Sequence, residues 1–206
     1  MHACGHCFNP GDLWVMAGPV DEIPDRLFAR AVWKWDTTMD ADVAFWRRLT
    51  PRILRLLAAG CLHIDATLVA RKFNQAAWRD WPEDERSVVA EFCEAWFEAA
   101  LTEPEGPAAV EVLPFVAILY GDVARWLAVW SATPGRRADR QLAELAGWWL
   151  PDLLGGALDL SFSGELPDVA AEMTAWLLDQ APTRIHEGDL SPDDAYRLAH
   201  LALPKA

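Results

Sequence analysis

A chain of 206 residues with 18 basic and 31 acidic side chains has a formal net charge of −13, and 52% of its residues are hydrophobic. This length and composition fit one globular domain with a sizeable core and exclude a disordered or low-complexity chain. The acidic balance also argues against nucleic acid as the main partner, because phosphate binding needs a basic surface.

Targeting and membrane segments are not expected. No basic segment followed by an apolar run opens the chain, so a secretory signal is not predicted. No uncharged apolar run approaches the roughly 18 residues of a membrane span. Four cysteines in a chain of this size do not suggest a disulfide framework. We therefore expect a cytoplasmic protein with reduced thiols and no membrane partner.

The first 20 residues are predicted to form a loose cysteine- and histidine-containing segment. Asn9, Pro10 and Gly11 are helix and strand breakers, so Cys4 and Cys7 are expected to lie in turns before any regular element.

Helical periodicity dominates the rest of the chain, and strand signals are scarce. Helices are predicted at residues 24–35, 40–60 with a kink or new start at Pro51, 65–78, 82–101, 107–120, 122–130, 138–149, 167–180 and 191–203. We expect one domain over residues 1–206, with a weak subdivision near residues 161–166, where Ser and Gly cluster.

The clearest amphipathic helix is predicted over residues 82–101. Pro82 and the three acidic residues after it form a helix start, since carboxylates in the first turn meet the positive end of the helix dipole. Its apolar face contains Cys93 and Trp96, which we interpret as core residues. The row of Glu91, Glu94 and Glu98 on the other side is interpreted as solvated.

These patterns predict an all-α fold: a helical array or orthogonal bundle of roughly nine to eleven short helices. Weak echoes about forty residues apart resemble a HEAT-like repeat. Twelve tryptophans spread along the chain suggest helix-packing contacts more than one aromatic binding site.

The tetrapeptide Cys4-Gly5-His6-Cys7 is the sharpest local motif. It is also found in protein disulfide isomerases, but there the first cysteine follows a strand and begins a helix inside a βαβ frame. Nothing in the sequence predicts that frame here, so a thioredoxin-like redox site is the less favoured interpretation.

A zinc site is the more favoured functional interpretation of the same motif. Two thiolates separated by two residues can bind one Zn²⁺, and a closed structural site needs four ligands. Cys61 and His63, which follow the predicted helix end at Gly60, are the natural further ligands, and His2 and His6 are rivals. The simpler alternative is unliganded thiols at Cys4 and Cys7 with a packed Cys61.

Other catalytic signatures are missing from the sequence. There is no P-loop, no dinucleotide-binding glycine motif and no nucleophile elbow. Four arginines form a local basic patch that could bind an anion, although pairing with the many carboxylates is the simpler explanation. They are Arg47, Arg48, Arg52 and Arg55.

The stretch from Ala31 to Ala58, followed by residues 77–82 (AWRDWP), resembles a family of uncharacterised bacterial proteins. Members begin with a short cysteine-containing segment, followed by an aromatic-Thr-Thr segment, a Leu-Pro-Arg-Ile-Leu-like helix and a Trp-Pro turn. Thr50 replaces the usual residue before the proline. The resemblance covers about the first half, and it implies neither an activity nor any catalytic residue.

Two functional hypotheses follow. The first is a cytoplasmic, non-catalytic helical protein that binds another protein, with a basic partner as one version, and with or without a small structural zinc site. The second is a metal- or thiol-dependent enzyme that uses Cys4, Cys7, Cys61 and His63.

Overall fold

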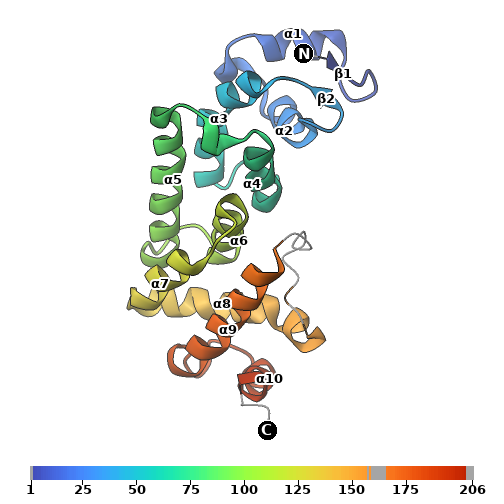
Figure 1. Cartoon of the computed structure of the whole chain (residues 1–206). Coiled ribbons are helices and arrows are strands. Elements are labelled where there is room, and N and C mark those ends of the chain that lie inside the picture. The colour runs from blue at the N-terminus through green and yellow to red at the C-terminus, as the bar shows by residue number, and fades with distance from the viewer. Residues whose placement is uncertain (1, 157, 159–165, 203–206) are drawn as a thin grey trace. The chain divides into compact units, whose positions relative to one another are not determined.

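The computed structural model describes residues 2–156, 158 and 166–202 (Figure 1). Its α-helices are α1 (Pro10–Ala17), α2 (Asp25–Lys34), α3 (Val43–Ala58), α4 (Ala66–Gln75), α5 (Glu83–Thr102), α6 (Ala109–Tyr120), α7 (Ala124–Ala132), α8 (Arg136–Gly155), α9 (Pro167–Arg184) and α10 (Pro192–Ala202). Two 3₁₀ turns, η1 (Val20–Glu22) and η2 (Trp78–Asp80), and two short strands, β1 (His2–Ala3) and β2 (Met39–Asp40), complete the described elements.

The all-α prediction with about ten helices is confirmed for the described residues. The predicted HEAT-like repeat stays a prediction. The Ser- and Gly-containing stretch at residues 161–165 and the predicted helix end at Leu203 lie outside the described residues. No helix in the described ranges has the length and apolar character needed to cross a membrane.

The N-terminal segment differs from the prediction, because residues 2–20 contain regular elements. β1 pairs antiparallel with β2, with Ala3 opposite Met39. Helix α1 begins at Pro10, the residue interpreted as a breaker. Asn9 caps it: its side chain accepts the Asp12 N–H at 2.9 Å, and the Asp12 side chain accepts the Asn9 N–H. Proline in the first helical turn loses no intrahelical bond.

Helix α3 runs through Pro51 without a new start, and it begins later than predicted. Asp42, not Asp40, caps it by accepting the Phe45 N–H at 2.8 Å. Pro51 removes one amide donor, and Thr50 hydroxyl donates back to the Trp46 carbonyl at 3.1 Å. Helix α8 likewise continues through Pro151 to Gly155.

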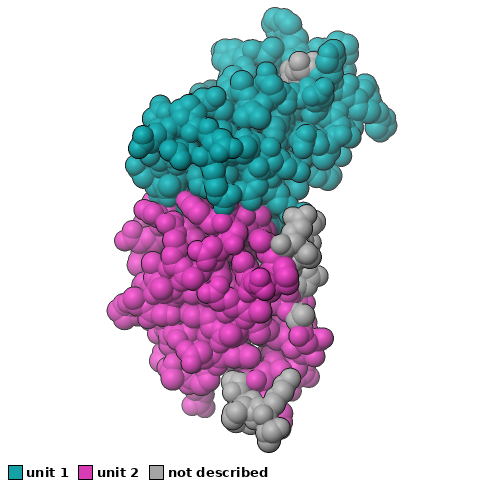
Figure 2. Space-filling view, viewed as in Figure 1, with its two compact units in different colours: residues 1–93 teal, residues 94–206 magenta. Residues whose placement is uncertain are grey.

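The chain divides into two compact units, residues 1–93 and 94–206, and the boundary falls inside α5 (Figure 2). Unit 1 is organised around a row of aromatic rings. Trp46 of α3 lies 4.8 Å from Trp35 and 5.6 Å from Phe73 of α4, and Phe73 lies 5.9 Å from Trp81, measured between ring centroids. These rings join the end of α2, helices α3 and α4, and the turn before α5.

Unit 2 has its own aromatic core. Phe97 of α5 lies 5.2 Å from Trp126 and 6.1 Å from Trp130, both of α7. Trp130 in turn lies 5.1 Å from Trp176 of α9. Helix α8 packs against α6, α9 and α10.

Most tryptophans are packing residues, as the sequence predicts. The buried ones are Trp35, Trp46, Trp78, Trp81, Trp96, Trp126, Trp130 and Trp149. Trp14, Trp33 and Trp148 are exposed. On α5, Cys93 is fully buried and the Glu91, Glu94 and Glu98 row is exposed, as predicted.

Candidate functional site

Cys4 and Cys7 lie at the two ends of one tight turn. The Cys4 carbonyl accepts the Cys7 N–H at 2.9 Å and the Phe8 N–H at 3.0 Å. The Cys4 N–H donates to Thr38 O at 2.8 Å, which extends the β1–β2 pairing by one bond. Cys4 is exposed and Cys7 is partly buried. The structure therefore brings these two predicted site residues together.

The surroundings of the Cys4 thiol lower its pKa below the usual cysteine value. The backbone N–H groups of His6 and then Cys7 lower the pKa of Cys4, because they donate to the thiolate form. Slight burial acts in the opposite direction. The Cys7 side chain and the positive charge of Lys34 lower the pKa further.

Cys61 and His63 lie in the loop after α3. Gly60 has φ of +63°, as expected for a residue that ends a helix, and His63 also has a positive φ, at +53°. The side chains of Cys61 and His63 are exposed, and the Cys61 thiol donates to the Ala59 carbonyl at 3.2 Å. Leu62 between them is buried and fixes the loop to unit 1.

No three histidine, cysteine or carboxylate side chains in the described ranges lie close enough together to hold a metal ion. The structure therefore does not gather Cys4, Cys7, Cys61 and His63 into one site. A zinc site made from these residues, with or without His2 and His6, stays a prediction.

The four arginines of α3 are engaged within unit 1, in agreement with the simpler explanation of their patch. Arg47 forms two hydrogen bonds with Glu85 of α5, one of 2.6 Å, and this lowers the pKa of Glu85. Arg55 pairs with Asp21 at 2.5 Å. Arg48 donates to the last carbonyls of α1.

Arg52 is buried and connects α3 to two elements that precede it in the chain. Its guanidinium donates to the carbonyls of Val20 and Ile23, the latter at 2.7 Å, and to Asp25 at 2.6 Å. It also lies 4.4 Å above the Phe28 ring. These contacts join α3 to η1 and α2 and leave no free cationic surface at Arg52.

A second candidate site, not predicted from the sequence, is an open groove of about 460 Å³ in unit 2. One wall is a stripe of α8, and the other is the segment that leads into α10. Its lining residues are Ala143, Glu144, Gly147, Trp148, Pro151, Asp189, Leu190 and Asp194.

The groove combines an exposed indole with unneutralised carboxylates. Trp148 is 72% exposed. Glu144 accepts a hydrogen bond from Gln141 at 2.7 Å, and Asp194 accepts one from Ser191 at 2.7 Å. Among the described residues, neither carboxylate pairs with a cationic side chain. Within the described ranges, the groove therefore presents an apolar face beside two carboxylates that have no cationic side-chain partner.

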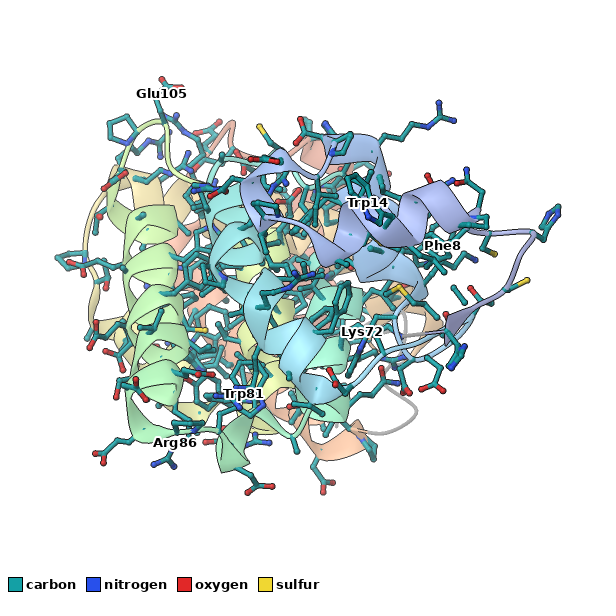
Figure 3. All side chains as sticks on the ribbon, turned by 90° about the horizontal axis from the view of Figure 1, so that it is seen from above. Phe8, Trp14, Lys72, Trp81, Arg86 and Glu105 are labelled. Carbon is teal, nitrogen blue, oxygen red and sulfur yellow. The ribbon has the colours of Figure 1, made fainter. Side chains whose placement is uncertain are left out.

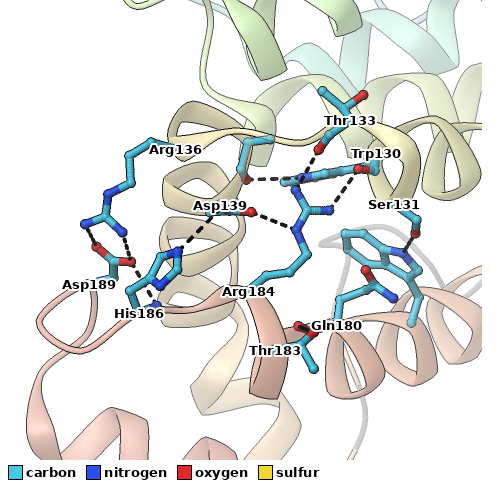
Figure 4. A network of polar contacts seen from close by, with 12 residues as sticks. Trp130, Ser131, Thr133, Arg136, Asp139, Gln180, Thr183, Arg184, His186 and Asp189 are labelled. Carbon is cyan, nitrogen blue, oxygen red and sulfur yellow. Dashed lines mark hydrogen bonds and ion pairs between the residues drawn. The ribbon is translucent and has the colours of Figure 1, made fainter.

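Ion pairs hold the segment around residue 189, which forms the other wall of the groove (Figure 4). Asp189 is only 7% exposed, and Arg136 at the start of α8 binds both of its oxygens, at 2.8 and 3.0 Å. Asp189 also accepts the His186 N–H at 3.0 Å. Its charge is thus neutralised, and its role is to hold Leu190 in place.

Arg184, at the end of α9, anchors the same region to α7 and α8. It donates to Asp139 at 2.7 Å and to the carbonyls of Trp130 and Thr133 at 2.9 Å each (Figure 4). His186 approaches Asp139 at 3.6 Å. These bonds give the groove a preformed wall.

Comparison with known proteins adds no family. No family model matches the chain, and no curated protein or solved structure is significantly similar to it.

Proposed function

We propose that this protein is a non-catalytic cytoplasmic binding protein whose groove between α8 and α10 takes up a basic segment of another protein. The observation that carries the proposal is the exposed Trp148 beside two carboxylates, Glu144 and Asp194, that have no cationic partner in the described chain.

The chemistry of the groove favours an arginine- or lysine-containing occupant. An indole face attracts a cation placed above it, and carboxylates nearby can bind its N–H groups. The small residues Ala143 and Gly147 leave room for the aliphatic part of such a side chain. Because the groove is open and shallow, it suits a polypeptide segment, and the net charge of −13 would steer a basic partner toward it.

A photo-crosslinking amino acid in place of Leu154, an exposed residue of α8 near the groove, would capture the partner for identification. The identified segment is then titrated as a synthetic peptide against the intact protein. Trp148→Ala is expected to weaken binding about 30-fold, the effect of a tryptophan hot spot of about 2 kcal/mol.

Two further variants define the mode of binding. The double variant Glu144→Gln, Asp194→Asn should weaken binding and reduce its dependence on salt, because two charge contacts are lost. Trp14→Ala removes an exposed tryptophan of unit 1, which is 81% exposed, and should leave affinity unchanged. Equal affinity of Trp148→Ala and the unaltered protein would reject the groove as the binding site.

A further inference from the structure

The turn at residues 4–7 supports an inference that is independent of the groove. The proposed function uses neither Cys4 nor Cys7, yet the structure places these two thiols together at an accessible position.

The turn keeps its two ends within about the separation that a disulfide spans. A hydrogen bond from the N–H of residue i+3 to the carbonyl of residue i defines a turn whose end Cα atoms lie within about 7 Å. Disulfides span Cα separations of about 4.4–6.8 Å. Cys4 and Cys7 are the end residues of such a turn, and neither is held in another bridge. Closing the bond therefore needs side-chain rotation more than backbone movement.

Both sides of the turn are anchored. Before it, the Cys4 N–H is bonded to Thr38 O at the end of the β1–β2 pair. After it, Phe8 is buried, with the Arg30 guanidinium 5.0 Å above its ring, and Asn9 caps α1. Because the chain is held on both sides, the two thiols stay close in the reduced protein and have little entropy to lose on joining.

The two cysteines differ in a way that assigns their roles. Cys4 is exposed and is therefore the thiol that an external disulfide reaches first. Cys7 is partly buried and less open to an external disulfide. An attacking cysteine at the surface and a second cysteine behind it is the arrangement of a resolving pair.

We propose that Cys4 and Cys7 form a reversible disulfide by exchange with a small-molecule disulfide. The Cys4 thiolate attacks one sulfur of the disulfide, a Cys4–S bond forms, and the first thiolate leaves and takes up a proton. Cys7 then loses its proton to solvent and attacks the Cys4 sulfur, which releases the second thiolate. In sum, two protein thiols are oxidised by two electrons and one external disulfide is reduced to two thiols.

The test equilibrates the full chain, without oxygen, in mixtures of reduced and oxidised glutathione, followed by acid quenching, alkylation in denaturant and peptide mass analysis. Cys4 and Cys7 are expected to become protected together with the loss of two hydrogens. Cys61 and Cys93 should remain open to alkylation. In Cys7→Ser, a Cys4–glutathione adduct should accumulate, because nothing resolves it. Cys61→Ser is the matched control and should behave as the unaltered protein does.

Three results would overturn the proposal. The first is a Cys4–glutathione adduct that is equally abundant with and without Cys7. The second is pairing of Cys4 with Cys61, within or between chains. The third is stoichiometric zinc in protein purified without added metal that is lost in Cys4→Ala, since the thiols would then be metal ligands.

Discussion

At the scale of single residues, Lys72 is a cation placed inside a core. Lys72, labelled in Figure 3, is 2% exposed. Its ammonium group donates to the Trp35 carbonyl. Burial lowers the pKa of Lys72, and Asp36 opposes this shift only in part. Taking the ammonium group out of water therefore costs folding free energy while the group stays charged.

Lys72 should make stability rise with pH. Below its folded pKa the ammonium is charged in both states and the full cost of burial is present. Between that value and the usual lysine value near 10.5, the unfolded chain binds a proton that the folded chain does not. The free energy of unfolding therefore increases with pH over that interval. Urea unfolding at a series of pH values should show this rise, and Lys72→Met should lack it.

Lys34→Met serves as the control for that series, because Lys34 is only partly buried and lies over the Trp33 ring. It should keep the slope of the unaltered protein. A slope unchanged in Lys72→Met would show that another group causes the dependence.

At the scale of elements, Arg52 connects α3 to the segment before α2 and to the first residue of α2. Arg52→Met is expected to destabilise the protein by about 2–3 kcal/mol, because the buried Ile23 carbonyl and the partly buried Val20 carbonyl lose their donor and Asp25 loses its partner. Glu85→Gln removes the partly exposed Arg47 pair and should cost under about 1 kcal/mol. Unfolding of both variants in denaturant measures how much stability each one loses. Equal losses of stability would contradict the role of Arg52 in joining α3 to η1 and α2.

Two glycines should respond in opposite ways to alanine. At Gly106, a Cβ would lie 2.2 Å from the Ala99 carbonyl oxygen. The loop after α5 is also held there by Arg137, which donates to the Gly106 carbonyl at 2.9 Å. Gly106→Ala should destabilise by about 1–3 kcal/mol or more. At Gly147, inside α8, a Cβ would touch Leu190 at an ordinary 3.5 Å. Gly147→Ala should stabilise by about 0.5–1 kcal/mol.

Thermal unfolding of the two alanine variants measures both predicted changes in stability, a loss for Gly106→Ala and a gain for Gly147→Ala. A loss of stability in Gly147→Ala would mean that α8 and the segment at Leu190 lie closer than described. A neutral Gly106→Ala would mean that the backbone at Ala99 moves aside at little cost.

The helices were predictable because their signals are local. Apolar spacing and cap residues such as Asp65, which accepts the Thr67 N–H at 2.8 Å, need no distant partner. Pro10 was misinterpreted, and Pro51 left a kink and a new helix start as alternatives, because proline can begin, continue or end a helix according to its capping and packing. The Cys4–Cys7 pair was visible from its spacing. The groove was not, since Trp148 and Asp194 meet only through the packing of α8 on α10.

At the scale of the whole molecule, α5 belongs to both compact units. Its first half carries Glu85, which binds Arg47, and its second half carries Trp96, whose ring lies 5.4 Å from that of Phe115. The boundary at residues 93 and 94 thus divides one continuous helix and not a linker. A substitution that disrupts the middle of α5 should therefore destabilise both units.

Glu91→Pro tests this expectation. Glu91 is exposed, so the change removes no core contact, but proline deletes its amide donor and clashes with the preceding turn, at a cost of about 3 kcal/mol. Hydrogen exchange followed by mass spectrometry should show lost protection in α3 and in α6, whereas Glu91→Ala should leave both protected. Loss confined to one unit would show that the two halves of α5 act separately.

The uneven exposure of the tryptophans gives the protein built-in optical probes. Trp148 faces solvent beside the groove, while eight other indoles are buried. Replacing Trp14 and Trp33 by phenylalanine would leave Trp148 as the most exposed of the ten remaining tryptophans. Quenching by a dissolved ion such as iodide would then fall mainly on that residue, and covering the groove would shield it. Occupancy of the groove could be followed by light emission alone, without attaching a dye.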